Sequence, residues 1–314
     1  MVDNYKSCYL RIDFKDGTLF RKQISDKLKV EILPVVKNIT EEIDKLKNEI
    51  RNRIKELKKN FPGVHAFVGV NDISNIKKAV EKGIELANAQ KSDVIFFTGD
   101  LVNNKADEMH GWEPLFSSIQ AKKGKFSILG NHDYGDYVKW GEQDEKQENL
   151  KHLIELHQAI GFRPLLNDAV ELSEGAWLLG VENWGKAPFR QSGKLPETLA
   201  KVPADSFKIL LSHDPSHFDA QVVGHTNIDL TLSGHTHGMQ FGIERFGIKF
   251  SPVSFKYPKW AGLYEVGKQY LYVNRGFGFL GFPGRVGIYP EITLFTLKKT
   301  ALNDHLFHSK NIPT

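Results

Sequence analysis

Cysteine is almost absent from this chain, and so are the long apolar runs that cross membranes. Cys8 is the single cysteine among 314 residues, which excludes an intramolecular disulfide framework and any cysteine-based zinc site. No segment approaches the roughly 18 consecutive apolar residues of a membrane span. Residues 1–6 lack the basic head and apolar stretch of a signal peptide, so we expect none. These absences predict a cytoplasmic chain whose contact with a membrane is at most peripheral.

The chain also lacks a large excess of charge of either sign. Its 42 basic and 38 acidic residues leave a net charge of +4, which is mild and spread along the sequence. No arginine-rich block with interleaved aromatics is present, so we expect no nucleic acid partner. A hydrophobic content of 40% and a charged content of 25% are ordinary for a globular protein.

The first sixty residues are predicted to form a small unit of their own. Residues 9–14 alternate apolar and polar side chains, and Asp16-Gly17 is a strong turn signal before residues 18–20, which together indicate a hairpin. A long helix is predicted over 39–59, with one narrow apolar stripe made by Ile39, Ile43, Leu46, Ile50, Ile54 and Leu57. A coiled-coil seam for self-association and a helix docked on the neighbouring domain both fit this stripe.

From residue 64 onward, predicted strands and helices alternate, which indicates an α/β domain. Phe61-Pro62-Gly63 ends the long helix and marks the boundary before this domain. We expect strands over 66–70, 94–98, 126–129, 176–181, 209–212, 228–232, 270–273 and 292–297, and helices over 76–89 and 144–159. The expected organisation is therefore an N-terminal extension over 1–62, a main domain over 63–300 and a tail over 301–314.

Four of the predicted strands end in residues that bind metals well. The clusters are Gly99-Asp100, Gly130-Asn131-His132-Asp133, His213-Asp214-Pro215 and Gly234-His235-Thr236-His237. In open α/β sheets ligands bind beyond the carboxyl ends of the strands, so four such ends can build one site. Asp, Asn and His donors suit manganese, iron or zinc rather than a thiolate metal. Each cluster alone is more often a turn, and it is the four together that predict a metal site.

The last cluster carries two imidazoles one residue apart. Side chains that alternate along an extended chain point to opposite faces, so the backbone must bend before both rings reach one site. We expect Gly234 to supply the bend, because glycine adopts backbone conformations that are closed to other residues.

These clusters resemble the signature of the calcineurin-like metallophosphoesterases. The similarity spans residues 67–297, and residues 181–185, 212–217 and 272–278 also resemble a bacterial branch that includes membrane-associated phosphodiesterases. The resemblance implies a four-layer α-β-β-α sandwich and a dinuclear centre of two divalent ions, Mn, Fe or Zn, that hydrolyses phosphoesters.

The first motif of that family departs from its pattern in this chain. Members carry Asp-x-His at the end of the first sheet strand, where this chain has Asp72-Ile73-Ser74 after residues 66–70. Asp72 matches the aspartate, but Ser74 stands in place of the histidine. Either the motif has degenerated or residues have been lost after it. We do not expect His65 to replace the ligand, because it lies at the other end of the strand, roughly 20 Å away.

The resemblance also implies a role for each candidate residue. Asp100 would bridge the two ions. Asn131, His213 and His235 would complete the shell of the second ion, and Asp72 and His237 would belong to the first, which the loss of one imidazole weakens. His132 resembles a histidine that contacts phosphate and protonates the leaving oxygen. Asp133 either orients that imidazole or caps a helix over 134–140.

Two functions of different classes fit these observations. The first is a metal-dependent phosphoesterase that hydrolyses phosphodiester or pyrophosphate bonds, with a lipid-linked substrate as one option and with activity reduced by the degenerate first motif. The aromatic loop 277–283 either offers an apolar surface to such a substrate or packs as an ordinary loop. The second is a catalytically impaired homologue that acts as a binding or interaction module through its N-terminal helix.

Overall fold

A computed structural model describes residues 9–14, 29–32, 73–245, 248–276, 278–280, 285–288 and 290–297. Several of the sequence predictions lie outside these residues and stay predictions. They are the helix over 39–59, the boundary at 61–63, the strand over 66–70, residue Asp72 and the tail over 301–314.

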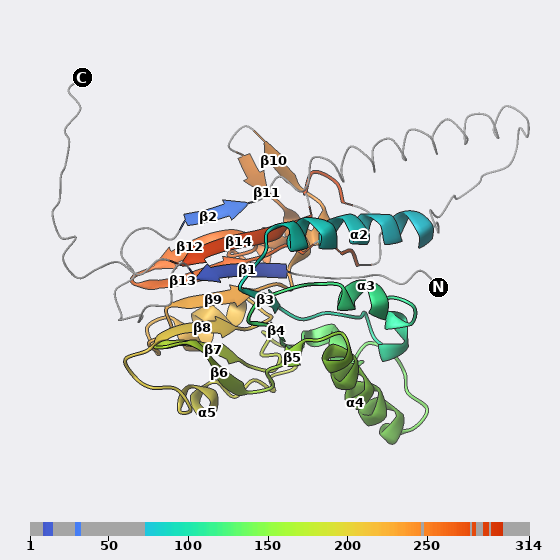
Figure 1. Cartoon of the computed structure of the whole chain (residues 1–314), viewed down its shortest axis with the longest axis horizontal. Helices are drawn as coiled ribbons and strands as arrows, with labels where there is room; N and C mark the ends of the chain where they lie inside the picture. Colours follow the sequence, from blue (N-terminus) through green and yellow to red (C-terminus); the bar gives the residue numbers. More distant parts are fainter. Residues whose placement is uncertain are drawn as a thin grey trace, which may run out of the picture.

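Two six-stranded sheets form the centre of the described structure. In spatial order, the first sheet contains β2 (Lys29–Ile32), β14 (Ile292–Leu297), β1 (Tyr9–Phe14), β3 (Val94–Phe97), β4 (Gly124–Ser127) and β5 (Arg163–Pro164). The second contains β12 (Gly262–Val266), β13 (Gln269–Val273), β9 (Leu230–Ser233), β8 (Phe207–Leu211), β7 (Ala176–Gly180) and β6 (Asp168–Ser173). A ribbon of β10 (Ile243–Arg245) and β11 (Ile248–Phe250) stands apart from both sheets (Figure 1).

Helices pack on the outer faces of the sheets, and short helical turns lie in the connections between strands. The α-helices are α2 (Ile73–Ala89), α3 (Glu113–Ser117), α4 (Gln143–Ala159) and α5 (Leu195–Leu199). The short turns are η1 (Ala106–Met109), η2 (Asn131–Tyr134), η3 (Phe218–Val222), η4 (His237–Gln240) and η5 (Pro252–Phe255). None of the described helices combines the length and the apolar character that a membrane crossing requires.

Alternating apolar side chains on the buried strands determine the layers. On β3, Val94 and Phe96 lie in the core between the two sheets. Ile95 and Phe97, which point the other way, pack with side chains of α2, α3 and α4. On β8, Leu210 belongs to a third core with side chains of α5 and η3. Successive strand side chains point to opposite faces, so these patterns give two sheets packed face to face between helical layers. The predicted four-layer α-β-β-α sandwich is confirmed.

Parallel pairing brings the ends of the four candidate strands to one edge of the sandwich. β3 runs parallel to β4 in the first sheet, and β8 runs parallel to β9 in the second. Their observed bounds differ from the predicted ones by at most two residues at either end. The loops that follow these strands carry the metal-binding clusters, so the fold positions all four clusters on the same side.

The first strand of the chain lies within the main sheet. β1 pairs in parallel with β14 and antiparallel with β3, and β2 also pairs with β14. The sequence predicted a separate hairpin instead, because alternation and turn signals are local and do not reveal a distant partner strand. The predicted hairpin partner, residues 18–20, lies outside the described residues.

Two further segments differ from the sequence predictions. Helix α2 begins at Ile73 rather than at residue 76, so Ser74 lies in its first turn and not in a loop after a strand. Residues 134–140 do not form the predicted helix. The helical turn is instead η2, which ends at Tyr134 and is followed by turns.

His157 on α4 is a buried imidazole that should make stability depend on pH. Its ring contacts Phe97 edge-on, and neither ring nitrogen has a hydrogen-bond partner among the described residues. Burial lowers the pKa of His157 from 6.5 to about 4. Between these values the unfolded chain binds a proton that the folded chain excludes. Stability should therefore fall by up to roughly 3 kcal/mol as the pH drops through this window.

We expect His157→Phe to remove this component of the pH dependence. Urea unfolding at a series of pH values between 7 and 4 measures it. His152→Phe, an exposed position on the same helix, is the matched control and should leave the slope unchanged. An identical slope in the parent and in His157→Phe would contradict the assignment.

Candidate metal centre

Asp100 lies where the turn after β3 and the turn after β4 approach each other closely. It follows β3 and adopts a left-handed backbone conformation, with φ of 61°, next to Gly99 with φ of 93°. A Cβ on Gly99 would lie 2.5 Å from the backbone nitrogen of Gly130, and a Cβ on Gly130 would lie 2.3 Å from Oδ1 of Asp100. Both positions therefore require glycine, because no larger residue fits between the turns.

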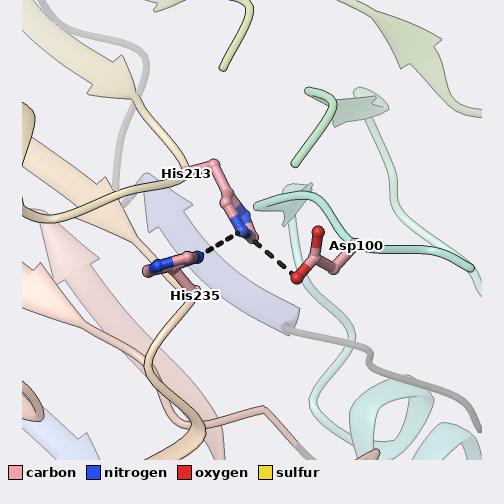
Figure 2. Close-up of side chains that lie close together, drawn as sticks. All are labelled: Asp100, His213 and His235. Atoms are coloured by element: carbon pink, nitrogen blue, oxygen red, sulfur yellow. Dashed lines mark hydrogen bonds and ion pairs between the residues drawn. The ribbon is translucent and has the colours of Figure 1, made fainter. Parts of the chain in front are cut away.

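Three side chains from three strand ends point toward one another in Figure 2. His213 Nε2 lies 3.3 Å from Asp100 Oδ2 and 3.3 Å from His235 Nδ1. One ligand atom from each of these residues lies within 4.8 Å of the others. Donors that bind one ion at about 2.1 Å lie roughly 3 to 3.5 Å from one another, so this spacing suits a shared cation.

Asn131 adds an amide oxygen to the same group. Its Oδ1 lies 3.1 Å from His213 Nε2 and 2.8 Å from His235 Nδ1. Its Nδ2 donates to the hydroxyl of Tyr137 at 2.7 Å, which identifies the oxygen as the atom that faces the imidazoles. A carboxylate, an amide oxygen and two imidazoles form a donor set that fits a divalent transition metal.

His237 also lies near Asp100. Its Nε2 lies 3.9 Å from Asp100 Oδ2, the same oxygen that faces His213. His235 and His237 both have positive φ, 67° and 51°. The backbone therefore bends at His235 and His237, and not at Gly234 where we expected the bend. One oxygen of Asp100 therefore has two imidazole nitrogens nearby, at 3.3 and 3.9 Å.

Hydrogen bonds to the remote ring nitrogens orient two of the imidazoles. His213 Nδ1 lies 2.7 Å from the carbonyl oxygen of Thr98, which favours the tautomer with Nε2 free to bind a metal. His235 Nε2 lies 2.8 Å from the hydroxyl of Tyr257, which in turn donates to Asp214 Oδ2 at 3.3 Å. Both rings are thereby aimed with their other nitrogen at the shared group.

The electrostatics of the centre also favour a bound cation. Burial alone would lower the pKa of His213, but the neighbouring Asp100 carboxylate raises it overall. Burial and the charge of Asp100 raise the pKa of Asp133 to about 7, against the backbone hydrogen bonds that favour its charged form. Two buried carboxylates close together repel each other, and a cation bound to Asp100 offsets that repulsion.

The carboxylate of Asp133 accepts hydrogen bonds from the backbone of the turns after β3 and β4. Its Oδ2 accepts from the backbone N–H groups of Asp100 and Gly130, both at 2.8 Å. Its Oδ1 accepts from Leu101 at 2.8 Å and from Val102 at 3.2 Å. The alternative in which Asp133 orients His132 is therefore wrong. The capping alternative agrees better with the contacts, because Asp133 accepts a hydrogen bond from the backbone N–H of Gly130, the residue before η2. The helix expected over 134–140 is nevertheless absent.

His132 lies beside the centre and is oriented by other groups. Its backbone N–H donates to Asp100 Oδ1 at 2.9 Å, and its Nδ1 lies 2.8 Å from the carbonyl oxygen of Asn103. Its ring packs on Tyr137 with centroids 4.5 Å apart. The sequence analysis missed Tyr137, Tyr257 and Asn103, because each lies outside the four clusters and no local pattern marks it.

The first motif stays a prediction. Asp72 lies outside the described residues, and so does the side chain of Ser74. The described part of the chain therefore contains the candidate ligands Asp100, Asn131, His213 and His235, with His237 Nε2 3.9 Å from Asp100 Oδ2.

The fold and this donor set together define a metallophosphoesterase. The chain belongs to the calcineurin-like phosphoesterase family, whose profile matches residues 64–239. The uncharacterized metallophosphoesterase YkuE of Bacillus subtilis is 34% identical over 68% of this chain and 70% of its own length. The phosphodiesterase YaeI of Escherichia coli is 29% identical, over 72% and 76%. LpxG of Chlamydia muridarum, named a UDP-2,3-diacylglucosamine pyrophosphatase, is 24% identical, over 71% and 81%.

Replacing Asp133 should weaken both the fold and the metal centre. In Asp133→Asn, an amide N–H₂ would face two of the four backbone donors and leave them unsatisfied, at a cost of roughly 2–4 kcal/mol. Metal affinity should fall about 10- to 100-fold, as it does when groups that orient ligands are lost. Thermal unfolding of the metal-free protein and titration with manganese measure the two effects. Asp205→Asn, an exposed position, is the control. Unchanged metal affinity in Asp133→Asn would contradict its positioning role.

Proposed function

We propose that this chain is a metal-dependent phosphoesterase that hydrolyses phosphodiester or pyrophosphate bonds at a dinuclear centre. The position of Asp100 carries the proposal. Its Oδ2 lies 3.3 Å from His213 Nε2 and 3.9 Å from His237 Nε2, and Asn131 and His235 lie against His213. The names of the relatives YaeI and LpxG, a phosphodiesterase and a pyrophosphatase, support the same reaction class.

The residues around the centre can perform the proton transfer that the reaction requires. Bound divalent ions supply the charge that neutralises phosphate oxygens and activates water. We assign to His132 the proton for the leaving oxygen, because its ring lies beside the metal ligands and is oriented by the carbonyl oxygen of Asn103, 2.8 Å from its Nδ1. The bond from its backbone N–H to Asp100 fixes the imidazole next to the metal ligands.

We further infer that the first metal is held more weakly than the second. A neutral serine hydroxyl is a poor ligand compared with imidazole, and Ser74 stands where the family has histidine. This inference rests on the sequence alone. It predicts reduced turnover at low metal concentration.

An exposed apolar surface beside the centre supports a lipid-linked substrate. We call it the apolar ribbon face, and its residues are Met239, Phe241, Ile243, Phe250, Phe255, Leu280 and Val286. Phe250 pairs across the ribbon with Ile243 and contacts the ring of Phe255, which is 84% exposed. The ribbon directly follows η4, which begins at His237. Apolar patches of this kind on a protein surface mark sites of interaction, and LpxG is named for a diacylated substrate.

Chelation and replacement of His132 test the proposed reaction. The protein should hydrolyse bis(4-nitrophenyl) phosphate with added manganese, lose this activity with a chelator and regain it with metal. His132→Ala should lower turnover by about 10²–10⁴-fold, the usual contribution of a general acid, with its metal content unchanged. Elemental analysis of the parent in the same experiment counts the bound ions.

The control for this variant is His152→Ala, an exposed histidine on α4, which should keep full activity. Loss of metal from His132→Ala would show that His132 is a ligand. No turnover by the metal-loaded parent would reject the enzyme and favour the impaired homologue.

The apolar ribbon face is tested by comparing a lipid with a water-soluble substrate. In Phe250→Thr combined with Phe255→Thr, the KM for UDP-2,3-diacylglucosamine should rise by at least about 30-fold, because burying even one aromatic ring contributes about 2 kcal/mol and about 1.4 kcal/mol corresponds to a factor of ten. The KM for bis(4-nitrophenyl) phosphate should not change. Val266→Thr, an exposed apolar position at the far end of β12, is the control. Equal changes for both substrates would contradict a lipid-binding role.

A further inference from the structure

Tyr137 lies in the turn after η2 and contacts two residues of the candidate site at once. Its hydroxyl accepts a hydrogen bond from Nδ2 of Asn131 at 2.7 Å. Its ring packs on the imidazole of His132, with centroids 4.5 Å apart. Asn131 is a candidate metal ligand, and His132 is the residue to which we assign the proton for the leaving oxygen. One side chain thus contacts a ligand through its polar end and the proposed acid through its apolar body.

The backbone of this turn is anchored on both sides of Tyr137. Asp136 forms a bidentate ion pair with Arg190, in which Nε lies 3.1 Å from Oδ2 and Nη2 lies 3.1 Å from Oδ1. Trp140 Nε1 donates to the carbonyl oxygen of Gly135 at 2.7 Å. Paired N–H···O bonds from an arginine fix geometry as well as adding energy. The backbone therefore holds Tyr137 in place, although its side chain is 48% exposed.

The hydroxyl of Tyr137 supports the orientation of Asn131 that suits a metal. An amide offers a metal only its oxygen, because its nitrogen carries two N–H donors and accepts nothing. Oδ1 of Asn131 faces His213 and His235, while Nδ2 donates to the tyrosine hydroxyl. A phenyl ring cannot accept this hydrogen bond. Without the hydroxyl, water must satisfy the amide group, and the ligand loses the partner that aims its oxygen at the imidazoles.

The ring of Tyr137 restricts the imidazole of His132. The imidazole is also held at its Nδ1, which lies 2.8 Å from the carbonyl oxygen of Asn103. A hydrogen bond at one edge permits the plane of the imidazole to tilt, and an aromatic ring packed against it limits that tilt. A general acid must stay within hydrogen-bond reach of the leaving oxygen, so a less restricted imidazole transfers its proton less efficiently.

We propose that Tyr137 is a positioning residue whose two parts act on different steps. Its hydroxyl sets the affinity of the site for metal by orienting Asn131, and its ring sets the rate of proton transfer by orienting His132. The role of the hydroxyl rests on the metal centre alone. The role of the ring rests on the proposed function and deepens it, because His132 is the acid in that reaction.

Manganese titration of Tyr137→Phe tests the hydroxyl. This variant keeps the ring and loses only the hydrogen bond to Asn131. Its Kd for manganese, measured by calorimetry on the metal-free protein, should rise about tenfold, the lower end of the usual effect, because water reaches this side chain. At saturating manganese, its kcat for bis(4-nitrophenyl) phosphate should stay within about twofold of the parent.

Tyr137→Ala removes the ring as well and tests its role. The Kd for manganese should equal that of Tyr137→Phe, whereas kcat at saturating manganese should fall about tenfold further. The loss should be larger for diphenyl phosphate than for bis(4-nitrophenyl) phosphate, because phenoxide is the more basic leaving group and depends more on the proton. A purely structural defect would lower both turnovers by the same factor.

Tyr270→Phe and Tyr270→Ala are the matched controls. Tyr270 pairs with Leu230 at the start of β9, at the opposite end of that strand from the metal centre. Its hydroxyl donates to Glu265 Oε1 at 3.3 Å. Both substitutions should leave the manganese affinity and the turnover of either diester unchanged.

Three outcomes would overturn the proposal. They are an unchanged manganese affinity in Tyr137→Phe, an equal loss of kcat in Tyr137→Phe and Tyr137→Ala, and an equal loss for the two diesters in Tyr137→Ala. No turnover by the manganese-loaded parent would reject the proposed function and with it the role of the ring. The titration of Tyr137→Phe would still decide on the hydroxyl, so the two failures are distinguishable.

Discussion

The described metal centre depends on one buried carboxylate, that of Asp133. It binds the backbone N–H groups of two turns, one after β3 and one after β4, and so fixes the relative positions of Asp100 and Asn131. A buried charge is tolerated only where hydrogen bonds replace its hydration, and four backbone donors do this here. The same contact draws the turns so close that Gly99 and Gly130 have no room for a side chain.

The ligands themselves are held in unfavourable backbone conformations. Asp100, His235 and His237 all have positive φ, which costs about 1–3 kcal/mol for a residue other than glycine. Such conformations persist only where the surroundings hold them. The backbone of Asp100 is held by its hydrogen bond to the carboxylate of Asp133. The loop of His235 and His237 is fixed by Thr236, whose hydroxyl donates to the carbonyl of Trp260 at 2.7 Å.

The sequence predicted an α/β domain and the convergence of four strand ends because both follow from patterns that are local and repeated, whereas the four-layer sandwich was implied by the family resemblance. Apolar strands ending in Asp, Asn or His recur four times, and parallel pairing then brings the ends together. The role of Asp133 was not predictable, because three of its four partners are backbone groups about thirty residues away. The place of β1 between β14 and β3 was missed for the same reason, and Tyr257 has no signature at all.

One short segment connects the metal centre with the apolar ribbon face. In and just after η5, Phe255 belongs to the apolar ribbon face and Tyr257 contacts His235. Ser251, which precedes η5, donates from its hydroxyl to the carbonyl of Gly238 at 2.8 Å and so ties the segment to η4, where His237 lies. The contacts of Ser251 and Tyr257 therefore connect the apolar ribbon face to the metal ligands through the backbone of one short turn.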